Sequence, residues 1–564
     1  MDNEIGANKF TWKADYMDSS RTHNSGFASF VRTMYSKHPI QDYGISAAEA
    51  DKYRTSVYGF PMMVFHNKGD AQNPVYEFIG LYNYNLDKGC DDNFGFCDFD
   101  IDSKVKNEDG SYKPFSEATE CWELCNNQGR RCSFKEANFE ETDEAGKLTV
   151  LNDFEVRYHA NADDIENAIN GDHKNDGAED FSAVPLIERN KYILDKMKNL
   201  EELVDWLVSV DAEAPTGTEL SEPYVINEST SYTHDTAEYR LAKFTKEFKD
   251  HFDEEYCTVY YVMTELLLCY DSRGKNLMLA TWGPQTEGGN YIWYPIFYDI
   301  DTQLGVNNAG VPYWDYYEEA SDTGTFSTPN SVLWNNMRKV MMPAIKNRYE
   351  KLRGNLLTIA KLNGYYNFDY EVSKSYAMHG ARPIIAINVD EYYKYIDCAI
   401  GNGYRNTNND LVTTTTYFYC LQGTRELQRA LFLRNRFNYI DSMWQCGDYS
   451  ITGSQQGIRM RYNANNILST SDKYLDSNVA ASFYALAYNA ASPAETPNFS
   501  YEAGKYYYCP EGSNAEERTS YILDEASEMT SGRNYYTSTG FEYSPYLENP
   551  LDTDMVIRIT PFLK

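Results

Sequence analysis

The sequence lacks both a long apolar segment and a recognisable leader. Its best apolar run, VYYVMTELLLCY, is interrupted by Thr264 and Glu265, whereas a membrane-spanning helix needs about 18 or more apolar residues. The first residues, MDNEIGANKF, contain neither a basic nor an apolar stretch, so they do not read as a secretory signal. We therefore expect a soluble protein without a membrane span, made in the cytoplasm.

Positive charge is scarce. The 564 residues include 51 Lys and Arg against 84 Asp and Glu, which gives a formal net charge of -33. A chain with this balance repels a phosphate backbone instead of neutralising it. Direct binding to nucleic acid is therefore not expected.

Several common site motifs are also missing. There is no H-E-x-x-H, no G-x-S-x-G and no P-loop, because RGKN places Asn276 where a P-loop requires Ser or Thr. The 11 cysteines include no C-x-x-C pair, and the run Cys121-x3-Cys125-x6-Cys132 has no histidine at ligand spacing. We expect reduced thiols and not a zinc site.

The residue patterns predict an α+β protein with two or three domains, as the length suggests. Short strands are expected in KFTWKADY, MMVFHN and VYEFIGLYNYNLDKG, with a helix between Asp15 and Ser36. A β-hairpin is expected where KNLMLATW and YIWYPIFYDI flank the turn-rich GPQTEGGN. The apolar periodicity predicts further helices at about Pro185–Val210, Thr236–Tyr270 with a break near Glu255, Ser331–Leu362, Val389–Ile400 and Thr424–Trp444.

The composition changes along the chain suggest domain boundaries. We expect an N-terminal domain over 1–330, with an acidic insertion at about 90–185 in which loops dominate. A helical segment over 331–445 and a β-rich C-terminal domain over 446–564 would follow. The last residues, MVIRITPFLK, have a strand pattern, which fits either a fragment or a terminal edge strand.

One set of polar residues has the spacing of a phosphotransfer site. In CYDSRGKNLML, Asp271 ends a helix and Asn276 opens a strand, and WYPIFYDIDTQLG then delivers Asp299 and Asp301 after the second hairpin strand. Protein kinases use the same Asp-x4-Asn interval: one carboxylate orients the attacking hydroxyl, and the Asn with a later Asp holds Mg2+. A capping Asp and an Asp-x-Asp turn are also common as purely structural features.

The chain resembles the CotH-type kinases over about Lys9 to Arg353. The resemblance is carried by FTWKADYMDSSRTHNSGFASFVRTMY, by PMMVFHN with YEFIGLYNYNLDKG, and by the block from Asp271 to Gly305. It implies a protein-kinase-like fold with Mg2+ and ATP as cofactors. It also implies residue roles: Asp271 catalytic, Asn276 with Asp299 or Asp301 at the metal, Lys13 at the phosphates, and Lys275 as an alternative phosphate contact.

Two kinase features are absent. The chain has no G-x-G-x-x-G loop, and Cys269 and Tyr270 occupy the two places before Asp271 where an H-R-D motif would have His and Arg. CotH-type kinases also dispense with these features, so phosphotransfer is not excluded.

A second resemblance reaches nearly the whole chain. KADYMDSSRTHNSGFASFV, CWELCNN, RNRFNYIDSMWQCGDYS, MRYNANNILSTSDKY and ITPFLK are similar to tail proteins of crAss-like phages, whose muzzle protein contains a CotH-like region. This implies a structural role in the virion tail, with copies of the chain and other tail proteins as partners. The alternatives are an active CotH-type Ser/Thr kinase and, in the aromatic C-terminal region, a receptor- or glycan-binding module.

Overall fold

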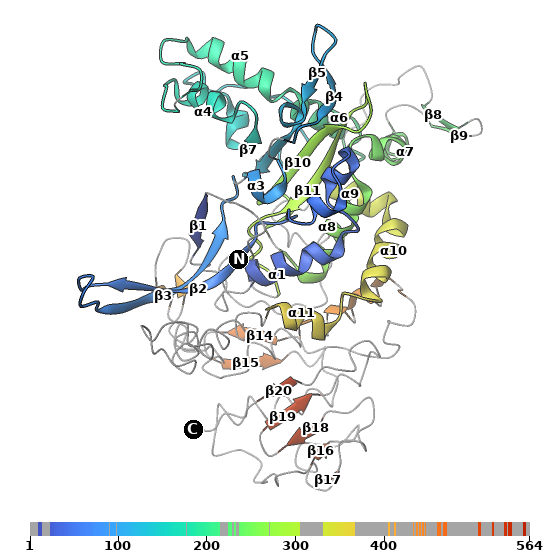
Figure 1. The fold of residues 1–564 in the computed structure, drawn as a ribbon. Helices are drawn as coiled ribbons and strands as arrows, with labels where there is room; N and C mark the ends of the chain where they lie inside the picture. Colours follow the sequence, from blue (N-terminus) through green and yellow to red (C-terminus); the bar gives the residue numbers. More distant parts are fainter. Residues whose placement is uncertain are drawn as a thin grey trace.

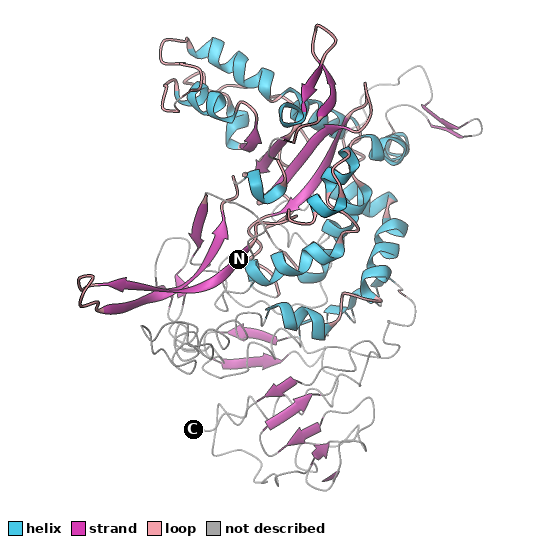
Figure 2. Ribbon diagram, viewed as in Figure 1, coloured by secondary structure: helices cyan, strands magenta, loops and turns pink. Residues whose placement is uncertain are grey.

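The structure is a computed structural model (Figure 1). It describes residues 9–13, 23–89, 91–96, 99–175, 177–214, 236–269, 271–304 and 331–366, together with short pieces of the remaining chain. Helices and strands alternate through these residues, so the predicted α+β class is confirmed (Figure 2). No helix among them has both the length and the apolar character needed to cross a membrane.

A four-stranded antiparallel sheet forms the centre of the described region. Its order is β11-β10-β6-β7. Alternate residues of β10 enter two different cores: Leu277 and Leu279 on one face, and Met278 and Trp282 on the other. Because both faces are buried, β10 and β11 read as continuous apolar runs. The strands are β6 Glu120–Leu124, β7 Phe154–His159, β10 Leu277–Pro284 and β11 Tyr291–Phe297.

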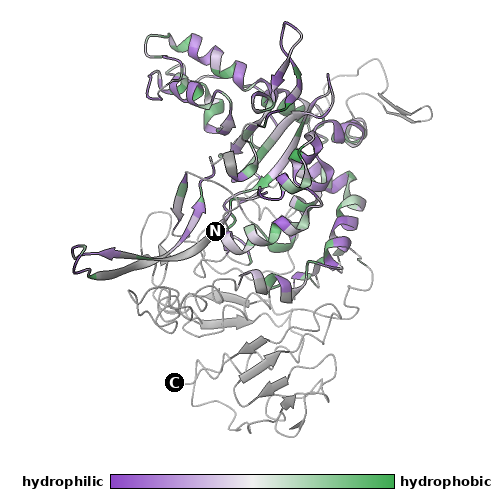
Figure 3. Cartoon of the chain, in the orientation of Figure 1, coloured by the Kyte–Doolittle hydropathy of each residue, from purple (hydrophilic) through white to green (hydrophobic). Residues whose placement is uncertain are grey.

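Helices cover one face of this sheet, and short elements cover the other. The helical side contains α6 Lys198–Ser209, α8 Glu254–Leu267, α9 Val332–Val340 and α10 Met342–Arg353. The opposite side contains η2 Pro39–Tyr43, α2 Ala47–Ala50, α3 Asp91–Phe94 and η3 Phe115–Ala118. Figure 3 shows hydrophobic residues along β10 and β11. More hydrophilic residues lie on α4 Ala162–Asn170 and α5 Leu186–Lys196, which extend from the body.

A second sheet has the order β1-β3-β2 and includes a long projecting hairpin (Figure 1). Its strands are β1 Phe10–Lys13, β2 Gly59–Asn67 and β3 Tyr76–Leu86. β1 pairs with the end of β3, from Phe10 opposite Leu86 to Lys13 opposite Asn83. The three predicted strands are confirmed, as is the early helix, observed as α1 His23–Val31.

Loops and turns make up most of residues 90–185, as expected, but the range also contributes regular structure to the central sheet. This range contains β4 Asp102–Lys106, β5 Tyr112–Pro114, β6, β7 and α4, and β6 is an interior strand of the central sheet. Its acidic sequence is misleading because the charges have partners: buried Glu120, for example, accepts hydrogen bonds from Trp122 Nε1 and Asn199 Nδ2. That residues 90–185 form an insertion relative to the kinase fold stays a prediction.

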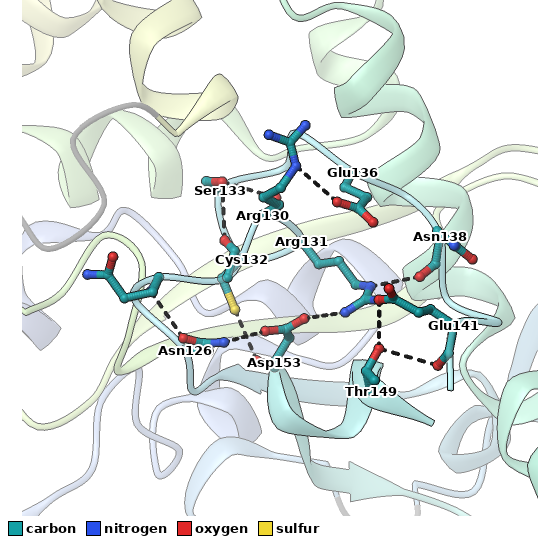
Figure 4. A network of polar contacts seen from close by, with 12 residues as sticks. Asn126, Arg130, Arg131, Cys132, Ser133, Glu136, Asn138, Glu141, Thr149 and Asp153 are labelled. Atoms are coloured by element: carbon teal, nitrogen blue, oxygen red, sulfur yellow. Dashed lines mark hydrogen bonds and ion pairs between the residues drawn. The ribbon is translucent and has the colours of Figure 1, made fainter. Parts of the chain in front are cut away.

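A polar network also orders the connection between β6 and β7 (Figure 4). The buried Arg131 guanidinium donates to Asp153 at 2.7 Å, to the main-chain oxygen of Asn138 at 2.7 Å and to Glu141 at 2.5 Å. Asn126 donates to the same Asp153 carboxylate at 2.8 Å. One arginine that donates to several acceptors therefore holds the conformation of this charge-rich connection.

The remaining predicted helices agree with the structure where it describes them. The helix expected to begin at Pro185 is divided at Met197 into α5 and α6. The next comprises α7 Ala237–Glu247 and α8, and the third comprises α9, α10 and α11 Ile359–Tyr366. Several residues between 432 and 444 are helical, in the predicted Thr424–Trp444 range, whereas Val389–Ile400 lies outside the described residues.

The C-terminal region contains strands, as expected. β16 Tyr506–Tyr508, β17 Ile522–Leu523, β18 Tyr535–Thr537, β19 Gly540–Tyr543 and β20 Ile557–Ile559 form one antiparallel sheet, with β20 at its edge. Three two-stranded sheets complete the described strands: β8 Tyr224–Asn227 with β9 Thr230–Tyr232, β12 Tyr404–Arg405 with β13 Leu411–Val412, and β14 Met460–Asn463 with β15 Asn466–Thr470.

A buried ion group connects the helical segment to α8. Glu265 is 1% exposed, and its carboxylate pairs with Arg436 at 3.0 Å and with Arg273 at 3.5 Å. Arg436 also donates to the main-chain oxygen of Glu265 at 2.7 Å. Residues on both sides of position 330 thus share one core, while the predicted domain boundary itself stays a prediction.

Replacing Arg436 by Met should lower the free energy of unfolding by about 3 kcal/mol, because it removes the nearer of two arginines that pair with a buried carboxylate. Denaturant-induced unfolding, followed by tryptophan fluorescence, measures this loss. Arg130→Met is the control, since Arg130 is 69% exposed in its ion pair with Glu136 and should cost less than about 1 kcal/mol. If both variants lost the same small amount of unfolding free energy, the Arg436 contact would not stabilise the fold as predicted.

Candidate functional site

The β10–β11 hairpin brings the predicted polar residues to one end of the central sheet. Leu277 lies opposite Phe297 in the antiparallel register, so the residue before β10 meets the residues that follow β11. Asn276 Nδ2 donates to Asp271 Oδ2 at 3.3 Å and to the main-chain oxygen of Asp299 at 3.5 Å. The structure therefore brings Asp271, Asn276 and Asp299 together.

Two of these residues have an unusual backbone conformation. Asn276 has φ 56° and Asp299 has φ 49°, both in the left-handed region. A side chain there costs about 1–2 kcal/mol, although Asn and Asp tolerate it better than most residues. Such strain is typical of functional positions that the surrounding structure holds in place.

Lys13 completes the group from the other sheet. Its Nζ lies 2.5 Å from Asp299 Oδ1, and the two side chains are 27% and 28% exposed. The lysine predicted to bind phosphate is thus paired with a carboxylate predicted to bind metal. These residues are 286 positions apart in the sequence.

Helix α1 positions the segment that follows Asp299. Asn24 accepts a hydrogen bond from the main-chain nitrogen of Ile300 at 2.8 Å and donates to Asp299 Oδ1 at 3.5 Å. His23 Nδ1 donates to the main-chain oxygen of Asp301 at 2.8 Å. His23 and Asn24 belong to the CotH-like motif FTWKADYMDSSRTHNSGFASFVRTMY. That motif did not predict that they would hold the segment after Asp299.

Asp301 takes part in this contact through its backbone, so its predicted role at a metal stays a prediction. The chain just beyond it is also held: Gln303 donates to the main-chain oxygen of His23 at 3.1 Å, and the Tyr366 hydroxyl donates to Gln303 at 2.8 Å. Residues 299–304 are therefore connected to both α1 and α11.

The loop that carries Asp271 is supported from the core by Arg273. This arginine is 1% exposed, its Nε donates to Thr264 Oγ1 at 2.9 Å, and its guanidinium lies 4.2 Å from the Tyr261 ring centroid. Trp334 Nε1 donates to the main-chain oxygen of Arg273 at 3.1 Å. Sequence reasoning missed this residue, because a buried arginine is not distinguishable from an exposed one by spacing.

Lys275 lies at the rim of the site. Its Nζ is 3.8 Å from Asp271 Oδ2, and its side chain is 44% exposed. A half-exposed lysine at this distance from its carboxylate partner contributes little to stability. Lys275 therefore remains accessible to another anion, as the alternative phosphate contact would require.

The donors in this group suit Mg2+. Two carboxylates and an amide oxygen are the hard ligands that this cation prefers, and the hydrogen bonds of Asn276 use its nitrogen, which leaves the oxygen for a cation. The three predicted aspartates do not themselves form a tight carboxylate cluster within the described part of the chain. A cation here would complete its shell with water or phosphate oxygens.

A different cluster has ligand atoms within 4.8 Å of one another: Glu123, Cys125 and Glu155. Arg157 donates to both glutamates, and burial raises the pKa of the Cys125 thiol to about 12. Paired carboxylates and a protonated thiol are poor ligands, because a thiol binds metal as the thiolate. This cluster is therefore best described as an ion-pair group. Cys121 and Cys132, like Cys125, are free thiols.

Comparison with known proteins adds no family assignment. A scan against protein-family models finds no match for this chain, and a search of curated proteins finds none either. The interpretation of the site therefore depends on its geometry and on the sequence motifs.

A double-mutant cycle with Lys13→Met and Asp299→Asn should give a coupling free energy of about 1 kcal/mol, because the pair is only partly exposed to solvent. Chemical unfolding of the four proteins measures it. The matched control is the cycle for Lys106→Met and Glu287→Gln, an ion pair whose side chains are 43% and 53% exposed. A Lys13–Asp299 coupling no larger than the control value would contradict the ion pair.

Proposed function

We propose that this chain is a structural component of a bacteriophage tail, built on a CotH kinase-like N-terminal domain. The support is the series of motifs, from KADYMDSSRTHNSGFASFV to ITPFLK, that resemble phage tail proteins. The 50 tyrosines suit a protein that works through extensive contacts, since Tyr provides a rigid contact area with a polar tip. Copies of the chain and other tail proteins are the proposed partners, and the virion tail is the proposed location.

One observation carries the kinase-like part of this proposal: the ion pair between Lys13 and Asp299. The two residues belong to separate motifs, and the CotH resemblance independently assigns both to the same site. The contact joins residues 286 positions apart, so closeness in the sequence does not account for it.

The site residues have complementary roles in this proposal. The Asn276 amide oxygen with Asp299 or Asp301 would hold Mg2+, and Lys13 would bind a phosphate of ATP. When bound, Mg2+ supplies charge neutralisation at the phosphate oxygens. Asp271 would orient a hydroxyl group and accept its proton.

An active Ser/Thr kinase is the second candidate. It is favoured by the contact between Asp271 and Asn276 and by the left-handed conformations kept at Asn276 and Asp299. Backbone conformations of this kind cluster at functional sites. Transfer of phosphate from ATP to protein separates this candidate from the purely structural role.

Asp299→Asn should weaken the binding of Mn2+, a spectroscopic substitute for Mg2+, at least about 10-fold, because it removes one ligand charge. Electron paramagnetic resonance of free Mn2+ measures the dissociation constant. Glu287→Gln is the control: this carboxylate also has a lysine partner but lies between β10 and β11 at the opposite end of the hairpin. Asp301→Asn, measured alongside, decides which aspartate serves the cation. Unchanged binding in both aspartate variants would sink the metal site.

The virion role predicts that mass spectrometry of purified particles, from the phage that encodes the chain, detects peptides from the chain in stoichiometric amounts. A density-gradient fraction of infected cells without particles is the control. Peptides confined to that fraction would refute the structural role and leave the enzyme as the surviving candidate.

A further inference from the structure

A third lysine, Lys88, lies beside the candidate site in addition to Lys13 and Lys275, and no sequence motif assigns it a role there. It follows β3 by two residues. Its Nζ lies 4.9 Å from the centroid of the Tyr298 ring, and the Nζ of Lys13 lies 4.9 Å from the same centroid. The two ammonium groups are therefore no farther apart than twice this distance, within reach of one polyphosphate chain.

This arrangement concentrates positive charge in an acidic protein. Two ammonium groups repel each other, and here each is offset by its own carboxylate: Asp299 for Lys13 and Glu123 for Lys88 at 3.0 Å. The shared Tyr298 ring adds cation–π attraction. Because the whole chain has a formal charge of -33, a phosphate ligand depends on local cations such as these two lysines.

Lys88 can leave its carboxylate partner at low cost. Glu123 is 5% exposed and also accepts from Arg157 Nε at 2.5 Å, so it keeps a buried cationic partner when Lys88 moves. A buried carboxylate that loses its last partner is strongly destabilised, but Glu123 would not be in that position. The Lys88 side chain is 29% exposed and therefore accessible to a ligand.

A cation and the Lys13 ammonium group would compete for the Asp299 carboxylate. This carboxylate is paired with Lys13 at 2.5 Å, and a cation at the same oxygen would compete with that ammonium group. Cation binding would thus release Lys13 toward an anion. Each ligand then favours the other, and this coupling is reciprocal by thermodynamic linkage.

We propose that Lys88 is a second phosphate-binding residue, acting with Lys13 on the phosphates of a nucleoside di- or triphosphate, and that the divalent cation and the phosphates bind cooperatively. This inference rests on the proposed kinase-like site. It adds a residue to which no motif assigned a role, and it makes the Lys13–Asp299 ion pair the contact that cation binding would replace.

The test is equilibrium binding of a fluorescent ATP analogue to the full chain, with and without Mg2+. Lys88→Met should weaken Mg2+-dependent binding about 10-fold, the effect of losing one charge-assisted hydrogen bond. Binding of fluorescent adenosine, which has no phosphates, should not change. Lys106→Met is the matched control, because Lys106 also has a glutamate partner and lies 5.3 Å from a tyrosine ring centroid.

The outcomes separate the inference from its premise. If the wild-type chain binds the analogue and Lys88→Met binds it equally well, Lys88 has no phosphate role and the inference is overturned while the site stands. A wild-type chain that binds no analogue overturns both. Lys88→Gln provides a second variant should Lys88→Met fold poorly, and equal affinity with and without Mg2+ in the wild type would refute the cooperativity.

Discussion

Burial of the central sheet on both faces limits where charged groups can lie in this protein. Every residue of β10 is buried, and an unpaired charge in such a position is costly. Neither β10 nor β11 contains a charged residue, so the charged side chains of the hairpin lie beyond the strand ends. The antiparallel pairing of Leu277 with Phe297 then places Asn276 and Asp299 at the same end. The location of the candidate site follows from the same packing that stabilises the core.

The surrounding structure holds this end of the sheet from several directions. Arg273 supports the Asp271 loop from the core, and α1 binds the segment after Asp299 through His23 and Asn24. These contacts explain how Asn276 and Asp299 can keep left-handed conformations without glycine. They also leave the side chains of Lys13, Lys88 and Lys275 partly exposed. The backbone and the acidic residues of the site are therefore held in place, whereas the lysine side chains can move.

Much of this arrangement could be predicted from the sequence, because local patterns determine it. The hairpin follows from two apolar runs around GPQTEGGN, and the hairpin in turn implies that Asp271, Asn276 and Asp299 converge. The position of β6 could not be predicted, since Glu120 and Glu123 make the strand look exposed and their partners, Asn199 and Arg157, are remote in sequence. The proximity of Lys88 depends on the Tyr298 ring, a tertiary contact without a sequence signal. The predicted role of Asp301 remains open for the same reason, because the spacing of a carboxylate does not fix its orientation.

The buried contact between Glu265 and Arg436 spans 171 positions, and this separation delays its formation during protein synthesis. During translation at about 5–20 residues per second, Arg436 is synthesised roughly 10–30 s after Glu265. Helix α8 must therefore spend this interval on the ribosome with its carboxylate and main-chain oxygen unprotected on that side. Nascent chains would stay susceptible to premature association until the arginine arrives, so the speed of synthesis, and not only the final fold, bears on how much of this protein reaches its native state.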